Sequence, residues 1–262
     1  MATEGKRATE RFSDRVADYV KYRPGYPEGL VAALEARHRW DPQQTVLADV
    51  GSGTGIASRL FLARGYSVLG VEPNADMRRA AEHENGAFPR FVSVDGTAEQ
   101  TTLATGSVDV VLAAQAFHWF DRARARDEFA RILRPSGVVV LLWNERRVEG
   151  PFLEAYEAVL RELATDYAEV DHRNAQQHVA DFFGEGACET LSVPNEQRFD
   201  REGFLGRAFS SSYVPKEGHP SHAAMRAGLE RVFDAHARDG VVVFAYDAKA
   251  YFGHLHHAQR RT

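Results

Sequence analysis

The stretch "ADVGSGTGIASRLFLARG" (residues 48–65) joins an apolar run to a helical one through three glycines at every second position. The apolar run, residues 45–50, is short and rich in buried-type residues, which is typical of a strand. The residues after the glycines have a helical pattern that ends at Gly65, and glycine commonly closes helices. We therefore expect a strand, a tight turn with an accessible backbone, and a helix.

The same alternation continues along the chain. Strand-like runs at residues 66–72, 90–96, 107–116 and 137–144 are interspersed with helical segments at 74–84 and 121–135. Short β-rich runs separated by helices of this length favour right-handed crossovers and a parallel sheet. We predict an α/β fold with a doubly wound, mostly parallel sheet.

The rhythm changes after residue 146. Residues 151–167 predict an amphipathic helix, and two further strands, 187–193 and 240–252, lie about 45 residues apart with a helix at 221–240 between them. This spacing predicts an antiparallel C-terminal hairpin whose connection forms a helical lid, so that the sheet has seven strands. We expect an N-terminal helical cap (1–40), an α/β core (41–146), and a segment that completes the sheet and carries the lid (147–262).

Composition and charge limit the classes of partner. The 262 residues carry a net charge of −5, and basic residues form nothing longer than pairs, whereas nucleic-acid binding favours a cationic stripe. The longest apolar run, residues 138–143, is far shorter than the roughly 20 residues of a membrane-spanning helix. A single cysteine, Cys188, fits a reducing compartment, and the polar start has no secretory pattern. We expect a cytoplasmic protein, monomeric or homodimeric, without nucleic-acid or membrane partners.

The glycine spacing bears on the ligand. Dinucleotide-binding folds use G-x-G-x-x-G, in which the last glycine lets the helix pack on the strand, but here Ile56 takes that place. The pattern D-x-G-x-G-x-G, with Asp49 as its acidic residue, instead resembles the first motif of class I S-adenosylmethionine-dependent methyltransferases. The resemblance implies that the loop approaches the amino-acid half of S-adenosylmethionine, and that Asp49 helps to hold its ammonium group directly or through water.

Two further strand ends carry candidate cofactor contacts. Glu72 ends the second strand, where a carboxylate can accept hydrogen bonds from both hydroxyls of a ribose. This predicts an adenosine ligand but suits NAD as well as S-adenosylmethionine. The third strand is followed by "DGTAEQ" (residues 95–100), which is similar to the family form G-D-A-E with Thr97 in place of Asp. The resemblance implies a contact with adenine here, for which the backbone of Ala98 is independent of that replacement.

Residues 110–121, "VVLAAQAFHWFD", resemble the "aqalHWfd" signature of the methyltransferase branch that includes trans-aconitate methyltransferase. The N-terminal "FSDRVADYVKYRPGYP" and the later "FSSSYVP" are also similar to that branch, so the resemblance spans nearly the whole chain. It implies a Rossmann-like methyltransferase fold. It also implies methyl transfer from S-adenosylmethionine to a small-molecule acceptor such as a carboxylic acid, with S-adenosylhomocysteine as product.

The resemblance and the strand ends together assign residues to three roles. The expected catalytic residues are His118, as a base or orienting donor, Arg23, as a clamp for a carboxylate of cofactor or acceptor, and Tyr22. For cofactor binding we expect Asp49, Gly51, Ser52, Gly53, Gly55, Glu72, Pro73, Thr97, Ala98 and Gln115. For substrate binding we expect Tyr19, Trp119, Asn144 and Tyr213.

Two other functions stay open at this point. An NAD(P)-dependent oxidoreductase is disfavoured by Ile56 but shares the role of Glu72, and a non-catalytic S-adenosylmethionine-binding module needs the same loop. The "HLHH" segment with His254, His256 and His257 lacks cysteine or carboxylate companions at ligand spacing, so we expect no metal.

Overall fold

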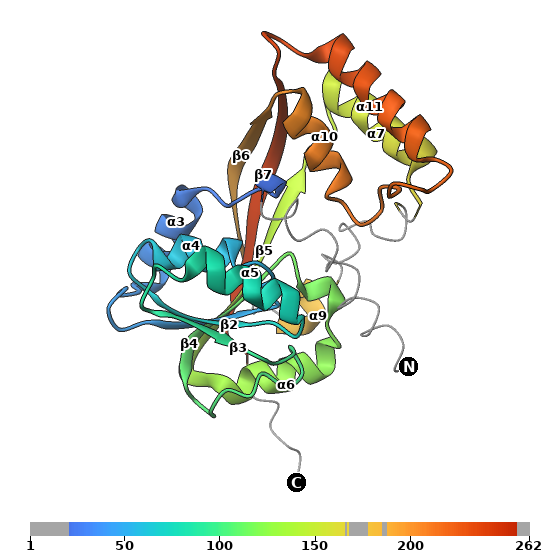
Figure 1. The fold of residues 1–262 in the computed structure, drawn as a ribbon. Helices are drawn as coiled ribbons and strands as arrows, with labels where there is room; N and C mark the ends of the chain where they lie inside the picture. The colour runs from blue at the N-terminus through green and yellow to red at the C-terminus, as the bar shows by residue number, and fades with distance from the viewer. Residues whose placement is uncertain (1–20, 166, 168–177, 185–187, 256–262) are drawn as a thin grey trace.

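The computed structural model describes residues 21–165, 167, 178–184 and 188–255. These residues form a seven-stranded sheet of order β3-β2-β1-β4-β5-β7-β6 (Figure 1). The first five strands are parallel, and β7 runs antiparallel to both β5 and β6. The predicted doubly wound, mostly parallel sheet with an antiparallel C-terminal hairpin is confirmed.

The strands align their carboxyl ends at one edge of the sheet, because Val50 lies opposite Val71 and Val71 opposite Val94. Ligands of open α/β sheets bind beyond this edge. The strands are β1 (Val46–Val50), β2 (Ser67–Val71), β3 (Phe91–Val94), β4 (Val108–Ala114), β5 (Leu133–Arg146), β6 (Glu189–Phe199) and β7 (Val242–Gly253).

Helices cover both faces of this sheet, which explains why its central strands are continuously apolar. On one face, Leu47, Val110 and Leu112 pack against α3 (Glu28–His38) and α4 (Ile56–Leu62). On the other face, Val111 and Ala113 pack against α6 (Arg122–Ile132) and α9 (Val179–Phe183). The helix α5 (Ala75–Asn85) follows β2 and contacts β3.

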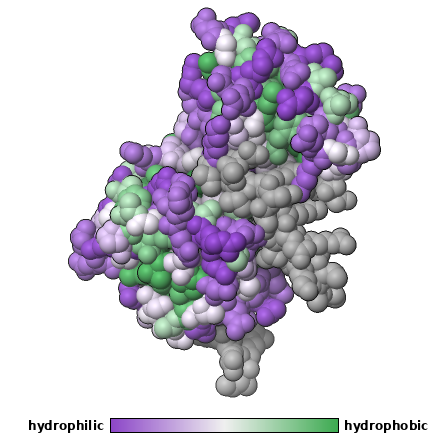
Figure 2. Space-filling view, viewed as in Figure 1, coloured by the Kyte–Doolittle hydropathy of each residue, from purple (hydrophilic) through white to green (hydrophobic). Residues whose placement is uncertain are grey.

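A third hydrophobic core lies beyond the main body of the sheet. There β5, β6 and β7 continue upward and carry α7 (Pro151–Leu163), α10 (Arg201–Phe209) and α11 (His222–His236) (Figure 1). Tyr156, Phe204 and Phe244 are buried at its centre. Hydrophilic residues cover much of the outer surface of this upper unit (Figure 2). We call α7, α10 and α11, together with residues 210–221 between α10 and α11, the lid.

Several predicted boundaries were wrong. The helix predicted over residues 121–135 ends at Ile132, because β5 already begins at Leu133 and pairs there with Val108 of β4. The strand predicted at 187–193 extends to Phe199, because β6 pairs with β7 along its whole described length. The helix α10 was not predicted. Within the described residues, no helix is both long and apolar enough to cross a membrane.

Candidate functional site

The glycine loop connects β1 to α4 at the carboxyl edge of the sheet. Gly51, Gly53 and Gly55 have φ angles of 70°, 56° and 78°, a left-handed conformation that favours glycine. The loop is tied to the next strand because the amides of Gly51 and Ser52 both donate to the carbonyl of Val71, at 2.8 and 3.2 Å. The three glycines are therefore required by the backbone conformation itself.

Surroundings differ sharply among the three glycines. A Cβ added at Gly51 would lie 2.7 Å from the Cβ of Ala116, and one at Gly55 would lie 2.2 Å from the side-chain nitrogen of Asn85. At Gly53 such an atom would meet nothing within 4 Å, and this residue lines the cavity described below. Protein atoms thus press on the outer two glycines, whereas the middle one leaves room for a ligand.

We expect Gly53→Ala to reduce the free energy of unfolding by about 1 kcal/mol, since only the positive φ opposes the new methyl group. The same methyl group should weaken binding of S-adenosylhomocysteine by about 1 kcal/mol, or roughly fivefold, through crowding of the cavity. Gly218→Ala is the matched control, because Gly218 has φ 87° and open space but does not line the cavity. Urea unfolding and calorimetry would measure both effects; equal cofactor affinity of the two variants would contradict the assignment.

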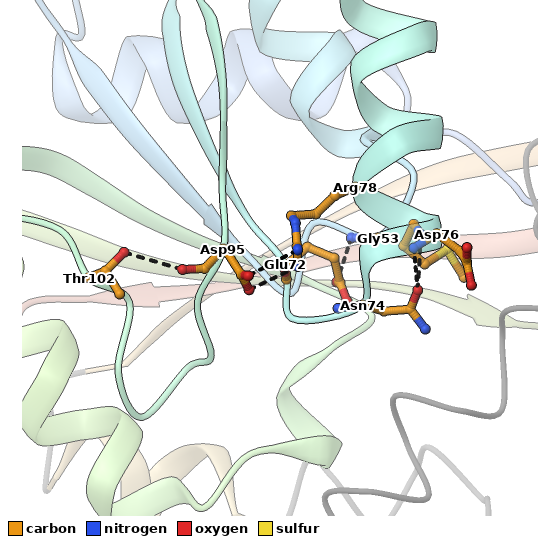
Figure 3. Close-up of polar contacts among 8 residues, drawn as sticks. Gly53, Glu72, Asn74, Asp76, Arg78, Asp95 and Thr102 are labelled. Atoms are coloured by element: carbon orange, nitrogen blue, oxygen red, sulfur yellow. Dashed lines mark hydrogen bonds and ion pairs between the residues drawn. The ribbon is translucent and has the colours of Figure 1, made fainter.

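Glu72 lies directly across from the loop, at the end of β2 (Figure 3). Its carboxylate accepts hydrogen bonds from the amides of Gly53, at 3.0 Å, and Asn74, at 2.9 Å. Burial raises the pKa of Glu72 above its usual range, although these two amides and Arg78 act in the opposite direction. The side chain lines the cavity and is 9% exposed, so it is a fixed acceptor at the position predicted for ribose.

The turn that follows Glu72 is rigidly held. Asn74 caps α5 by accepting hydrogen bonds from the amides of Asp76 and Met77 (Figure 3). Arg78 donates to the carbonyl of Glu72 at 2.7 Å and forms a two-nitrogen ion pair with Asp95 after β3. These contacts fix the ends of β2 and β3 relative to each other.

Asp49 lies behind the loop rather than on the cavity wall. It is fully buried, and its Oδ2 accepts a hydrogen bond of 2.6 Å from the Ser58 hydroxyl, while Oδ1 has no partner among the described residues. Burial raises the pKa of Asp49 to about 6, and the hydrogen bonds from Ser58 limit that rise. Asp49 is not among the described residues that line the cavity, so its contact with the ammonium group of a cofactor stays a prediction.

The remaining predicted cofactor residues follow the strand ends. Ser52, Pro73, Thr97 and Ala98 all line the cavity. Thr97 and Gln100 exchange backbone hydrogen bonds of 3.0 and 3.2 Å, which form the turn after β3. The amide of Ala98 donates to no residue in the described part of the chain, so it is available to a ligand.

Gln115 follows β4 with a φ of 55°, which is unusual for a residue other than glycine and occurs at functional sites. Its side-chain amide donates to the carbonyl of Asn144 at 3.3 Å. The next residues form a short 3₁₀ helix, Phe117–Trp119, anchored by the buried Phe117. Gln115, His118 and Trp119 all line the cavity.

The predicted site residues of the N-terminal segment do not all lie at the cavity. Arg23 lines the cavity and donates from Nη2 to the carbonyl of Ser210 at 3.2 Å, which joins this segment to the end of α10. Tyr22 is instead buried, and its ring contacts the backbone position of Gly206 in α10. Tyr22 is not among the described lining residues. Tyr19 lies outside the described residues, as do His256 and His257.

Asn144 and Tyr213 also line the cavity. The side chain of Asn144 has structural partners, because it donates to the carbonyl of Gly25 at 3.0 Å and accepts from Asn195 at 2.8 Å. Asn195 donates to the same Gly25 carbonyl at 2.9 Å. Asn144 therefore fastens the N-terminal segment to β5 and β6, and Tyr213 packs edge-on against Tyr167.

One cavity of about 550 Å³ joins the glycine loop and Glu72 to the underside of the lid. Sequence reasoning missed many of its lining residues, and those that bear on the lid end are Arg146, Tyr167, Arg207 and Tyr246. Only Arg207 had a usable signal, because it shares the buried face of α10 with Phe204 and Ala208 at helical spacing. A charged residue on an apolar helix face is a candidate functional residue. Among the described residues, no three His, Cys, Asp or Glu side chains are placed to hold a metal ion.

Comparison with known proteins agrees with this geometry. Residues 48–141, which span β1 to β5 and include the glycine loop and Glu72, match the family model described as a methyltransferase domain. A solved structure of an assigned type II methyltransferase from Anaeromyxobacter dehalogenans has a TM-score of 0.63 and 26% identity, over 89% of this chain and 98% of that chain. The chain therefore has the Rossmann-like fold of methyltransferases.

Curated relatives carry the same class of name. An uncharacterized methyltransferase of Mycobacterium tuberculosis is 40% identical over 136 residues, 52% of each chain. A Saccharomyces cerevisiae protein assigned as an S-adenosylmethionine-dependent methyltransferase is 32% identical over 128 residues, 46% of this chain and 42% of that one. The chain covers about half the length of these relatives. The narrower resemblance to the trans-aconitate branch stays a prediction.

Proposed function

We propose that this chain is an S-adenosylmethionine-dependent methyltransferase that acts on a small molecule. The observation that carries the proposal is one continuous cavity, which joins the glycine loop and Glu72 at one end to the lid at the other. A direct transfer between two bound molecules needs the cofactor and the acceptor to lie side by side, and one shared cavity provides this.

The residues around the glycine loop, Gly53, Glu72 and Ala98, fit this cofactor. Gly53 leaves open space beside the loop, the Glu72 carboxylate is fixed by two amides, and the amide of Ala98 is available. In our proposal Glu72 holds the ribose hydroxyls, and Ala98 holds the adenine edge. When bound, S-adenosylmethionine supplies a methyl group: the acceptor atom forms a bond to the methyl carbon, and the electron pair of the broken carbon–sulfur bond stays on sulfur.

The chain's own contribution is then orientation and exclusion of water. His118, Trp119, Arg23 and Tyr213 line the same cavity as the glycine loop. We place the acceptor against this group, with His118 as orienting donor or base. Asn144 supports the wall by fastening the N-terminal segment across the sheet edge.

Calorimetry with three ligands tests the cofactor. We expect S-adenosylmethionine and S-adenosylhomocysteine to bind beside the glycine loop and Glu72. We expect NAD to bind far more weakly, because Ile56 replaces the glycine that a pyrophosphate needs. Binding of NAD alone would favour the oxidoreductase. Release of S-adenosylhomocysteine across a panel of small acceptors then separates an enzyme from a non-catalytic binding module.

A further inference from the structure

Arg207 is a buried cation that faces the cavity, and it has no carboxylate partner among the described residues. It is 6% exposed and lines the cavity from the lid side. Its Nε donates to the hydroxyl of Tyr246 at 3.3 Å, and its Nη1 donates to the hydroxyl of Ser211 at 3.2 Å. No ion pair joins it to any described residue, and its Nη2 has no described hydrogen-bond acceptor.

Another arginine of the cavity, Arg146, is balanced by a carboxylate, and its side chain is 13% exposed. Arg146 forms an ion pair with Glu157 and also donates to the hydroxyl of Tyr167 at 2.9 Å. Glu157 additionally accepts from the exposed Arg161 at 3.1 Å. The charge of Glu157 is therefore already shared by two arginines, whereas the described hydrogen-bond partners of Arg207 are the hydroxyls of Tyr246 and Ser211.

We propose that Arg207 binds a carboxylate group of the methyl acceptor at the lid end of the cavity, an inference that rests on the proposed function. An arginine stays charged at any physiological pH, so its burial is costly unless an anion arrives. The lid thereby holds a preformed positive charge above the acceptor space.

The geometry and the charge favour a carboxylate over a phosphate. The terminal nitrogens Nη1 and Nη2 form a planar fork that matches two carboxylate oxygens, and only one of their hydrogens is used by Ser211. One negative charge balances Arg207. A phosphate monoester would bring up to two negative charges, one more than Arg207 balances.

The test uses the full chain saturated with S-adenosylhomocysteine. Benzoate and succinate are titrated as probes against their neutral amides, benzamide and succinamide, with phenyl phosphate as the phosphate arm. We expect at least one carboxylate to bind wild type at least tenfold more tightly than its amide. Arg207→Met should weaken that binding by roughly tenfold to a hundredfold, while S-adenosylhomocysteine affinity stays within about twofold.

Arg201→Met is the matched control. Arg201 belongs to the same helix and lies 4.7 Å over the ring of Phe233, but it is half-exposed and paired with Asp234. This variant should bind the probes like wild type. If Arg207→Met does not fold, Arg207→Lys keeps the charge but not the fork, and it should lower the carboxylate-to-amide ratio below that of wild type; an unchanged ratio would overturn the proposal.

The proposal is overturned if the carboxylates bind wild type no better than their amides, or if phenyl phosphate binds more tightly than either carboxylate. It is also overturned if Arg207→Met loses S-adenosylhomocysteine, because Arg207 would then serve the cofactor's own carboxylate. If wild type fails to bind S-adenosylhomocysteine, the proposed function is contradicted instead. Titrations of the probes in the absence of S-adenosylhomocysteine then still report on the anion site.

Discussion

Replacement of Glu72 by alanine is expected to weaken S-adenosylhomocysteine binding by about 1.5–3 kcal/mol, roughly tenfold to a hundredfold or more. The reason is that hydrogen bonds to a charged group are the stronger kind, and this carboxylate is 9% exposed and held by two amides. Titration calorimetry at constant pH would measure the change directly.

Glu72→Gln keeps the shape of the side chain and removes the charge, so it should fall between wild type and Glu72→Ala. Asp76→Asn is the control for a nearby carboxylate, because Asp76 is exposed and paired with Arg79 outside the cavity. Unchanged affinity of Glu72→Ala would show that the carboxylate serves only to hold the turn to Asn74.

Asp49→Asn is expected to raise the free energy of unfolding at pH 7.5 by about 1–3 kcal/mol. Burial raises the pKa of Asp49 from 3.8 to about 6, so the folded state binds this proton more tightly than the unfolded chain does. The contribution of this proton to the free energy of unfolding is fully present below pH 4, and it is lost as the pH rises through 6. Wild type and variant should therefore converge near pH 4 and separate near neutrality in urea unfolding.

Ser58→Ala is expected to change the free energy of unfolding in the opposite direction. It removes the 2.6 Å hydrogen bond that stabilises the Asp49 carboxylate, so it should lower stability at pH 7.5. Equal stability of Asp49→Asn and wild type at pH 7.5 would mean that the buried charge costs nothing. If the charge is retained for the ammonium group of the cofactor, Asp49→Asn should gain stability and bind S-adenosylhomocysteine less tightly.

Much of the fold follows from local patterns. The alternation of short apolar runs with helices predicts the parallel strands, and the late position of β7 predicts the hairpin. The ends of the strands were harder to predict from the sequence. Pairing with β7 extends β5 and β6, and this pairing is a contact between distant segments. The helix α10 was missed since its buried face alternates Phe204 with the charged Arg207.

The site residues also fall into a group that local sequence predicts and a group that depends on packing. Gly51, Gly53 and Glu72 converge because parallel strands bring their carboxyl ends together, and sequence order alone predicts this. Asp49 and Tyr22 lie next to cavity residues in the chain, but sequence adjacency does not decide which face a side chain occupies. Asp49 points to Ser58, and Tyr22 packs on Gly206. Arg207 reaches the cavity only through the packing of the lid.

The third core has a consequence for how such proteins diversify. Its buried residues, from Leu153 to Tyr246, form a cluster separate from the two that flank the sheet. The family match, residues 48–141, ends before this cluster begins. In the proposed function, substitutions in the lid would therefore alter the acceptor end of the cavity while the glycine loop and Glu72 stay unchanged. We expect a chimera that exchanges residues 200–241 with a relative to keep its affinity for S-adenosylhomocysteine and to differ in the acceptors that release it.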